Sequence, residues 1–116
     1  MSIKKLGEAV REIRKKRGVS LRKLAEKVDV SFVNLSHIEN GRIKTSRETI
    51  KQIAAALNYD TDKLLSKAEE INDDLEKIIN NKPTLVPQFL RTAKNLSKSD
   101  WEKVSNFTEN LKKEKK

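Results

Sequence analysis

The chain has 116 residues, of which 26 are Lys or Arg and 17 are Asp or Glu, so its formal net charge is +9. It contains no cysteine and one histidine, which excludes disulfides, thiolate metal sites and a His-rich metal centre. No apolar run approaches the roughly 20 residues of a membrane span, and the N-terminus lacks the apolar core of a signal segment. We therefore expect a soluble protein without a metal or cofactor. The positive charge favours a nucleic acid as its partner over an anionic membrane surface, and a charge that serves solubility alone is the third interpretation.

Five helices are predicted in the first 66 residues. Apolar residues recur there at three- and four-residue steps, and Ser or Asp precedes four of the five segments as an N-cap. The expected helices lie between Ile3 and Gly18, Ser20 and Val28, Ser31 and Asn40, Ser46 and Asn58, and from Asp60 to Leu65. Because no alternating strand pattern competes, an all-α bundle is expected.

The second half predicts about three more helices. Asp73-x-x-Glu76 resembles a capping box, Pro87 suits the first turn of a helix, and Ser97-x-x-Asp100 begins the last segment. A segment of this size cannot bury so many apolar side chains by itself. They must pack on the first domain or on another chain, and we favour another chain. The expected dimerisation residues are Leu85, Phe89, Leu90, Trp101, Val104, Phe107 and Leu111.

The positive charge is concentrated in the first part of the chain. Residues 1–66 hold 15 basic and 8 acidic side chains, net +7, whereas residues 67–116 hold 11 and 9, net +2. We therefore expect a basic domain over residues 1–68 and a helical dimerisation or regulatory segment over residues 69–116.

Two short helices joined by Val28-Asp29-Val30 have the pattern of a helix-turn-helix. The most specific residues are Leu24-Ala25, Ser31, Leu35-Ser36, Ile38-Glu39-Asn40-Gly41 and Ile53-Ala54. In their order and spacing they resemble the phage-repressor (Cro/CI, Xre) family over about residues 3–66. The resemblance implies a five-helix DNA-binding domain. Asp29 stands where the family often has Gly, and we expect it to adopt the left-handed conformation.

The resemblance implies that the start and outer face of the third helix contact bases in the major groove. The expected base-contacting residues are Ser31, Phe32, Val33, Asn34, Ser36 and His37. This face has no Arg or Lys for a bidentate contact to guanine, so Phe32 and Val33 would contact thymine methyl groups in A·T-containing half-sites. The alternative for these two residues is packing against the neighbouring helix.

Phosphate contacts are expected around that helix from the family pattern. They are assigned to Ser20, Arg22, Arg42, Lys44, Thr45 and Arg47. For Arg22 and Arg47, a solvated surface position is nearly as well supported. The resemblance also implies a structural ion pair between Arg14 and Glu39, which would tie the first helix to the end of the third.

Residues 73–114 are similar to the tails of Xre-type repressors that operate beside ImmA/IrrE-family metallopeptidases. This similarity rests on Pro83-Thr84-Leu85, on residues 90–96 and on Ser97-x-x-Asp100-Trp101. The two resemblances together imply a homodimeric transcriptional repressor that binds a palindromic operator in double-stranded DNA, in the cytoplasm and associated with the nucleoid. An ImmA/IrrE-type peptidase or a toxin is a possible second partner.

Two other classes of function remain as alternatives. One is an antitoxin or adaptor, whose tail binds a toxin or peptidase and whose DNA binding serves autoregulation. The other is an enzyme such as a nuclease, which would need a cluster of carboxylates. Asp73, Asp74 and Glu76 form the one acidic group in the sequence, and the capping interpretation fits it better. We therefore expect no catalytic residue and no enzyme activity.

Overall fold

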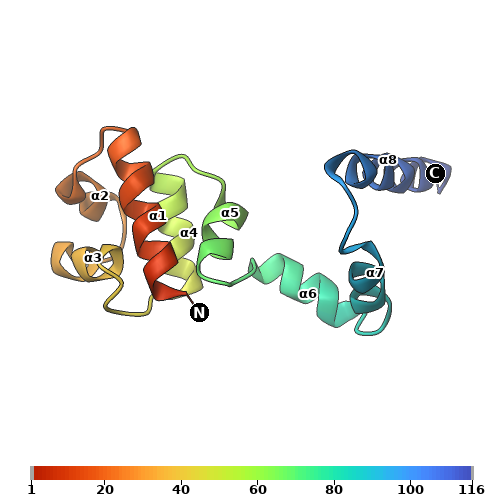
Figure 1. Cartoon of the computed structure of the whole chain (residues 1–116), viewed down its shortest axis with the longest axis horizontal. Helices are drawn as coiled ribbons and strands as arrows, with labels where there is room; N and C mark the ends of the chain where they lie inside the picture. Colours follow the sequence, from red (N-terminus) through yellow and green to blue (C-terminus); the bar gives the residue numbers. More distant parts are fainter. Residues whose placement is uncertain (1, 116) are drawn as a thin grey trace. The chain divides into compact units, whose positions relative to one another are not determined.

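The computed structural model describes residues Ser2 to Lys115. Its helices are α1 (Ile3–Lys16), α2 (Leu21–Lys27), α3 (Phe32–Glu39), α4 (Arg47–Ala56), α5 (Thr61–Lys67), α6 (Asp73–Asn81), α7 (Leu85–Ala93) and α8 (Lys98–Glu114) (Figure 1). This described range contains no strand, so the predicted all-α fold, with five helices followed by three, is confirmed. None of these helices is long and apolar enough to cross a membrane.

The helix boundaries follow the local chemistry of the sequence. Side-chain oxygens accept a hydrogen bond of 3.0–3.1 Å from the backbone N–H three residues later at Ser20, Ser31, Ser46 and Asp60. Each such cap contributes about 1 kcal/mol. At the other ends, Gly18 and Asn58 take positive φ angles of 66° and 51°, which allow the chain to leave α1 and α4. The predicted caps and stops are therefore confirmed.

The chain folds as two units, residues 1–76 and residues 77–116. The first unit has a hydrophobic core to which α1 to α5 all contribute. Its largest fully buried side chains are Leu6, Val10, Leu24, Leu35, Ile38, Ile50, Ile53, Leu57, Leu64 and Leu65. Helices α1 and α3 approach closely at Gly7, where a Cβ atom would lie 2.6 Å from the carbonyl oxygen of Glu39.

The turn between α2 and α3 differs from the prediction. Among the described residues, the non-glycine residues with positive φ are Asn58 and Glu69, so Asp29 is not left-handed. Its backbone N–H instead donates a 2.8 Å hydrogen bond to Oε1 of Gln52 on α4. The predicted left-handed conformation of Asp29 is wrong, because a side chain from α4 accepts the hydrogen bond of its backbone N–H.

In the second unit, α7 and α8 contact through aromatic side chains. The rings of Phe89 and Trp101 pack edge to face, with centroids 6.2 Å apart. Ser97 and Asp100 form the predicted capping box at the start of α8. Within residues 77–115, however, Ala93 is the one buried residue. The exposed large apolar side chains of these helices are Ile78, Leu85, Phe89, Leu90, Trp101, Phe107 and Leu111.

Candidate nucleic-acid interface

Helix α3 has a buried side and an exposed side of different chemistry. Leu35 and Ile38 are 0% and 2% exposed and belong to the core. On the outer side, Phe32 and Val33 are 41% and 60% exposed, although exposure costs free energy for side chains of this size. Asn34 is exposed beside them. The start of α3 therefore presents apolar and amide groups outward, with no charged side chain among them.

The two remaining candidates on α3 lie at the edge of this face. Ser36 and His37 are both half-buried. Nδ1 of His37 is buried and has no hydrogen-bond partner among the described residues. Nε2 is therefore the ring nitrogen of His37 that is available for a contact outside the chain.

The hydroxyl groups of Ser20 and Ser31 can each accept one hydrogen bond and donate another. Their oxygens accept from the backbone N–H groups of Lys23 and Asn34, both at 3.1 Å. A hydroxyl that accepts in this way still has its own O–H to donate. Both serines are exposed, so both can donate to a phosphate or a base edge while they cap their helices.

The segment after α3 carries the next basic side chains. Gly41 has a φ of 68° and turns the chain, and the backbone N–H of Arg42 then donates to the carbonyl oxygen of His37 at 2.9 Å. Arg42 and Lys44 are exposed, whereas Thr45 is half-buried. The backbone at Arg42 is thus fixed by α3, and its charged side chain is free to contact a ligand.

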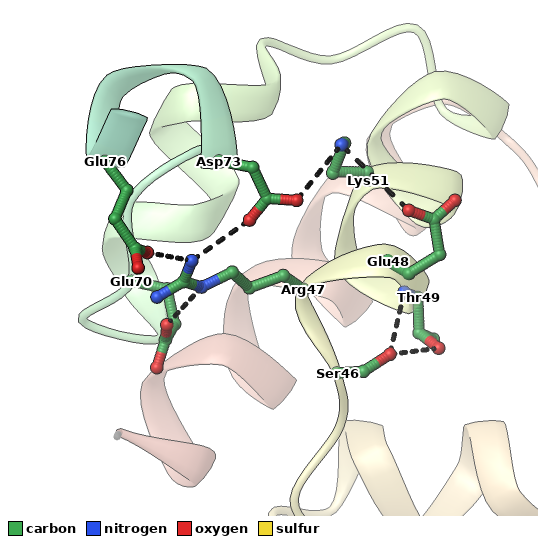
Figure 2. A network of polar contacts seen from close by, with 8 residues as sticks. All are labelled: Ser46, Arg47, Glu48, Thr49, Lys51, Glu70, Asp73 and Glu76. Carbon is green, nitrogen blue, oxygen red and sulfur yellow. Dashed lines mark hydrogen bonds and ion pairs between the residues drawn. The ribbon is translucent and has the colours of Figure 1, made fainter. Parts of the chain in front are cut away.

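Arg47 differs from the other predicted phosphate contacts, because three carboxylates surround its guanidinium (Figure 2). Its Nε donates to Glu70 at 2.7 Å, and one terminal nitrogen donates to Asp73 at 3.0 Å and also to Glu76. The hydrogen bonds to Glu70, Glu76 and Asp73 raise the pKa of Arg47. This side chain is therefore engaged within the chain, in competition with any phosphate contact.

The same network holds the beginning of α6. Asp73 is the first residue of α6 rather than the residue before it, so it does not stand at the N-cap position that the predicted capping box requires. A 4.0 Å ion pair joins Lys51 to Asp73 (Figure 2). Despite these acidic residues, no group of His, Asp or Glu side chains between Ser2 and Lys115 has an arrangement that could hold a metal ion.

An ion pair links α1 to the end of α3. Nε of Arg14 donates to Oε2 of Glu39 at 2.7 Å, and a terminal nitrogen donates to Oε1 at 3.0 Å. The side chains of Arg14 and Glu39 are 12% and 2% exposed. Arg11, one helical turn earlier on α1, also contacts Glu39 at 3.4 Å and donates to Asn40. Sequence reasoning missed Arg11, although its three-residue spacing from Arg14 places both on one face of α1.

A second missed contact lies between the two helices of the motif. Cζ of Arg22, near the start of α2, lies 5.1 Å from the ring centroid of Phe32 at the start of α3. This distance is within the range of a cation–π interaction. The sequence assigns Arg22 to phosphate and Phe32 to bases, and neither role by itself indicates that the two side chains meet.

The arrangement of these helices defines a class of protein. A short capped helix, a turn and a second capped helix with one buried and one exposed side form a helix-turn-helix, followed by exposed basic residues. A family model described as a helix-turn-helix domain matches residues 7–70, more than half of the chain. The chain belongs to this family, and the predicted resemblance to Cro/CI (Xre) proteins is confirmed.

Two curated relatives are similar to this chain. The HTH-type transcriptional regulator DdrOP3 of Deinococcus deserti is 35% identical over 69 residues, which are 60% of this chain and 54% of the relative. The ImmF control region 10 kDa protein of Bacillus phage phi105 is 37% identical over 57 residues, which are 49% of this chain and 63% of the relative. The chain thus spans less than two thirds of the length of these relatives.

A solved structure of a SinR protein/SinI protein complex contains a chain with a similar fold. The TM-score is 0.51 and the identity 25%, and the match covers 93% of this chain and 98% of that chain. The family match itself ends at residue 70. The similarity of residues 73–114 to repressors paired with ImmA/IrrE-family peptidases therefore stays a prediction.

Proposed function

We propose that this protein is a homodimeric, sequence-specific transcriptional repressor that binds a palindromic operator. In this proposal residues 1–68 bind double-stranded DNA, and residues 69–116 form the dimerisation and regulatory segment. Helix α3 enters the major groove, where Ser31, Phe32, Val33, Asn34, Ser36 and His37 contact base edges. Bound protein would then exclude polymerase from the promoter.

The observation that carries the proposal is the outer face of α3. Phe32 and Val33 are adjacent large apolar side chains that stay exposed at the start of α3, which is an unfavourable position unless a partner covers them. Thymine methyl groups in the major groove suit them, and the neighbouring Asn34 can hydrogen-bond to adenine. This favours A·T base pairs within each half-site.

The basic residues around α3 supply affinity rather than sequence preference. Ser20, Arg22, Arg42, Lys44 and Thr45 remain the proposed phosphate contacts, while Arg47 must first be released from its three carboxylates. Each Lys or Arg that neutralises a phosphate displaces counterions, so the affinity should fall steeply as salt is raised.

Dimerisation is supported by the chemistry of the second unit. Trp101, Phe107 and Leu111 of α8 and Leu85, Phe89 and Leu90 of α7 are exposed, and Val104 is half-buried. Helices with so little buried surface are unstable alone, and a second copy would cover these side chains. The dimer would place two α3 helices in successive major grooves, about 34 Å apart.

Selection of bound sequences from random double-stranded DNA tests this proposal. The full-length protein should enrich a palindrome with half-sites about 10 base pairs apart. A Val33→Ser variant should enrich an altered half-site, whereas Lys63→Ala, an exposed change on α5, should enrich the wild-type sequence. Absence of any enriched sequence with folded protein would rule out the proposed repressor.

A second candidate is an antitoxin or adaptor whose second unit binds a different protein. The same exposed apolar side chains favour it, and the SinR structure with a similar fold is that of a complex with SinI. Sedimentation of the purified protein separates the two candidates. A stable homodimer supports the repressor, while a monomer that forms a one-to-one complex with the product of an adjacent gene supports the adaptor.

A further inference from the structure

Arg22 and Phe32 form an exposed pair of side chains across the turn of the helix-turn-helix. Arg22 is the second residue of α2 and Phe32 is the first residue of α3. The guanidinium carbon lies 5.1 Å from the ring centroid, and both side chains are exposed. Because a cation–π contact at an exposed site is weak, the ring restrains the arginine without holding it rigidly.

The donors of Arg22 are free, unlike those of the arginines that form ion pairs. Arg14 and Arg47 donate to carboxylates. No hydrogen bond or ion pair within residues 2–115 engages the guanidinium of Arg22, which instead lies over the ring of Phe32. Its N–H groups lie in the plane of the guanidinium, so contact of one face with a ring leaves them available.

These free donors have the geometry that guanine requires. A guanidinium presents two parallel N–H groups that match O6 and N7 of guanine in the major groove. Helix α3 itself carries no Arg or Lys from Ser31 to Asn40. An Arg or Lys contact to guanine must therefore come from another element, and Arg22 lies against the first side chain of the helix proposed to enter the groove.

We infer that Arg22 contacts a guanine in each half-site, and that Phe32 positions it while itself contacting a neighbouring thymine methyl group. This inference rests on the proposed function and changes the expected half-site, from A·T pairs alone to A·T pairs beside one G·C pair. A phosphate contact carries no sequence information, whereas a bidentate contact to guanine does. The ring of Phe32 restrains the guanidinium plane that such a contact uses. For Arg22 this contact replaces the phosphate contact of the proposed function, and the phosphate contact is the competing outcome of the test.

The experiment compares full-length wild type with Arg22→Lys, Arg22→Ala, Phe32→Leu and the control Lys23→Ala. Affinity is measured for the selected operator and for a copy in which the G·C pair of one half-site is replaced by A·T. Wild type should prefer the original about 10- to 100-fold, as one bidentate contact allows. Arg22→Ala should lose this preference, and Arg22→Lys and Phe32→Leu should reduce it.

Lys23 is the matched control, because it is exposed, basic and adjacent to Arg22 but has no ring contact. Lys23→Ala should keep the full guanine preference. The inference is overturned if Arg22→Ala weakens binding equally on both sequences and lowers the salt slope by about one, which is the behaviour of a phosphate contact. The inference is also overturned if the enriched operator contains no G·C pair whose recognition depends on Arg22. That outcome leaves the repressor proposal intact. Failure of wild type to enrich any sequence would instead contradict the proposed function.

Discussion

Nε of Arg14 lies 2.7 Å from Oε2 of Glu39, whose side chain is 2% exposed, at the junction of α1 with α3. Because α3 is the helix proposed to contact bases, this ion pair fixes its end against the body of the first unit. The geometry is bidentate, which makes Arg14 a positioning residue rather than a ligand for DNA.

Arg14→Ala should destabilise the protein by about 3 kcal/mol, because Glu39 would keep a buried charge with only the longer contact to Arg11. The free energy of unfolding in urea measures this loss. Lys15→Ala, an exposed neighbour on the same helix, should change it by no more than about 0.5 kcal/mol. Equal unfolding midpoints for the two variants would contradict the structural role of the pair.

The contribution of the Arg14 charge should not vary with pH near neutrality. The hydrogen bond to Glu39 raises the pKa of Arg14 above its ordinary value, and desolvation offsets part of this rise. A group with a raised pKa in the folded state stabilises fully below its unfolded pKa and loses this contribution only as pH rises through the folded value. The difference in unfolding free energy between wild type and Arg14→Lys should therefore be constant from about pH 6 to about pH 9.

Gly7→Ala should cost about 3 kcal/mol, since the new Cβ would lie 2.6 Å from the backbone of Glu39 and force α1 away from α3. Gly18→Ala is the comparison. Apart from its chain neighbours, no described residue has an atom within 4 Å of its Cβ position, and only its φ of 66° opposes the change, at about 1 kcal/mol. Thermal unfolding should rank Gly7→Ala as the less stable variant, and the reverse order would exclude close packing at this crossing.

Arg42→Ala and Arg47→Ala should differ in the salt dependence of DNA binding. Arg42 is exposed and free, so its loss should lower the slope of log affinity against log salt by about one. Arg47 is held by three carboxylates, so its loss should leave the slope nearly unchanged.

The converse experiment removes the acidic partners. Glu70→Gln combined with Glu76→Gln leaves Asp73 as the one carboxylate in contact with Arg47. If the acidic residues compete with DNA for this side chain, the double variant should bind the operator more tightly at low salt. Unchanged binding would assign Arg47 a purely structural role at the start of α6.

Phe107→Asp should convert a homodimer to a monomer, because it places a charge in the proposed interface at a side chain that is 65% exposed in one copy. Glu102→Lys, an exposed change on the opposite face of the same helix, should remain dimeric. Sedimentation velocity gives the oligomeric state. Affinity for the full operator should fall about 100-fold in Phe107→Asp, while affinity for one half-site stays the same. A dimeric Phe107→Asp would place the interface elsewhere.

The sequence by itself determined the helices and their ends. Capping by Ser20, Ser31 and Ser46 involves atoms three residues apart, and the positive φ of Gly18 is a property of that residue, so both follow from neighbours in the chain. The inward position of Leu35 and Ile38 follows likewise from helical periodicity.

The tertiary structure decided which distant side chains meet. Nothing local indicates that Gln52 satisfies the turn at Asp29, that Arg47 is occupied by acidic residues more than 20 positions away, or that Arg22 rests on Phe32. Long charged side chains extend over several ångströms and have many potential partners within reach, so their contacts depend on how the helices pack. The sequence determines where the charged residues stand along the chain. The fold determines which of them form ion pairs within the protein and which stay free to contact DNA.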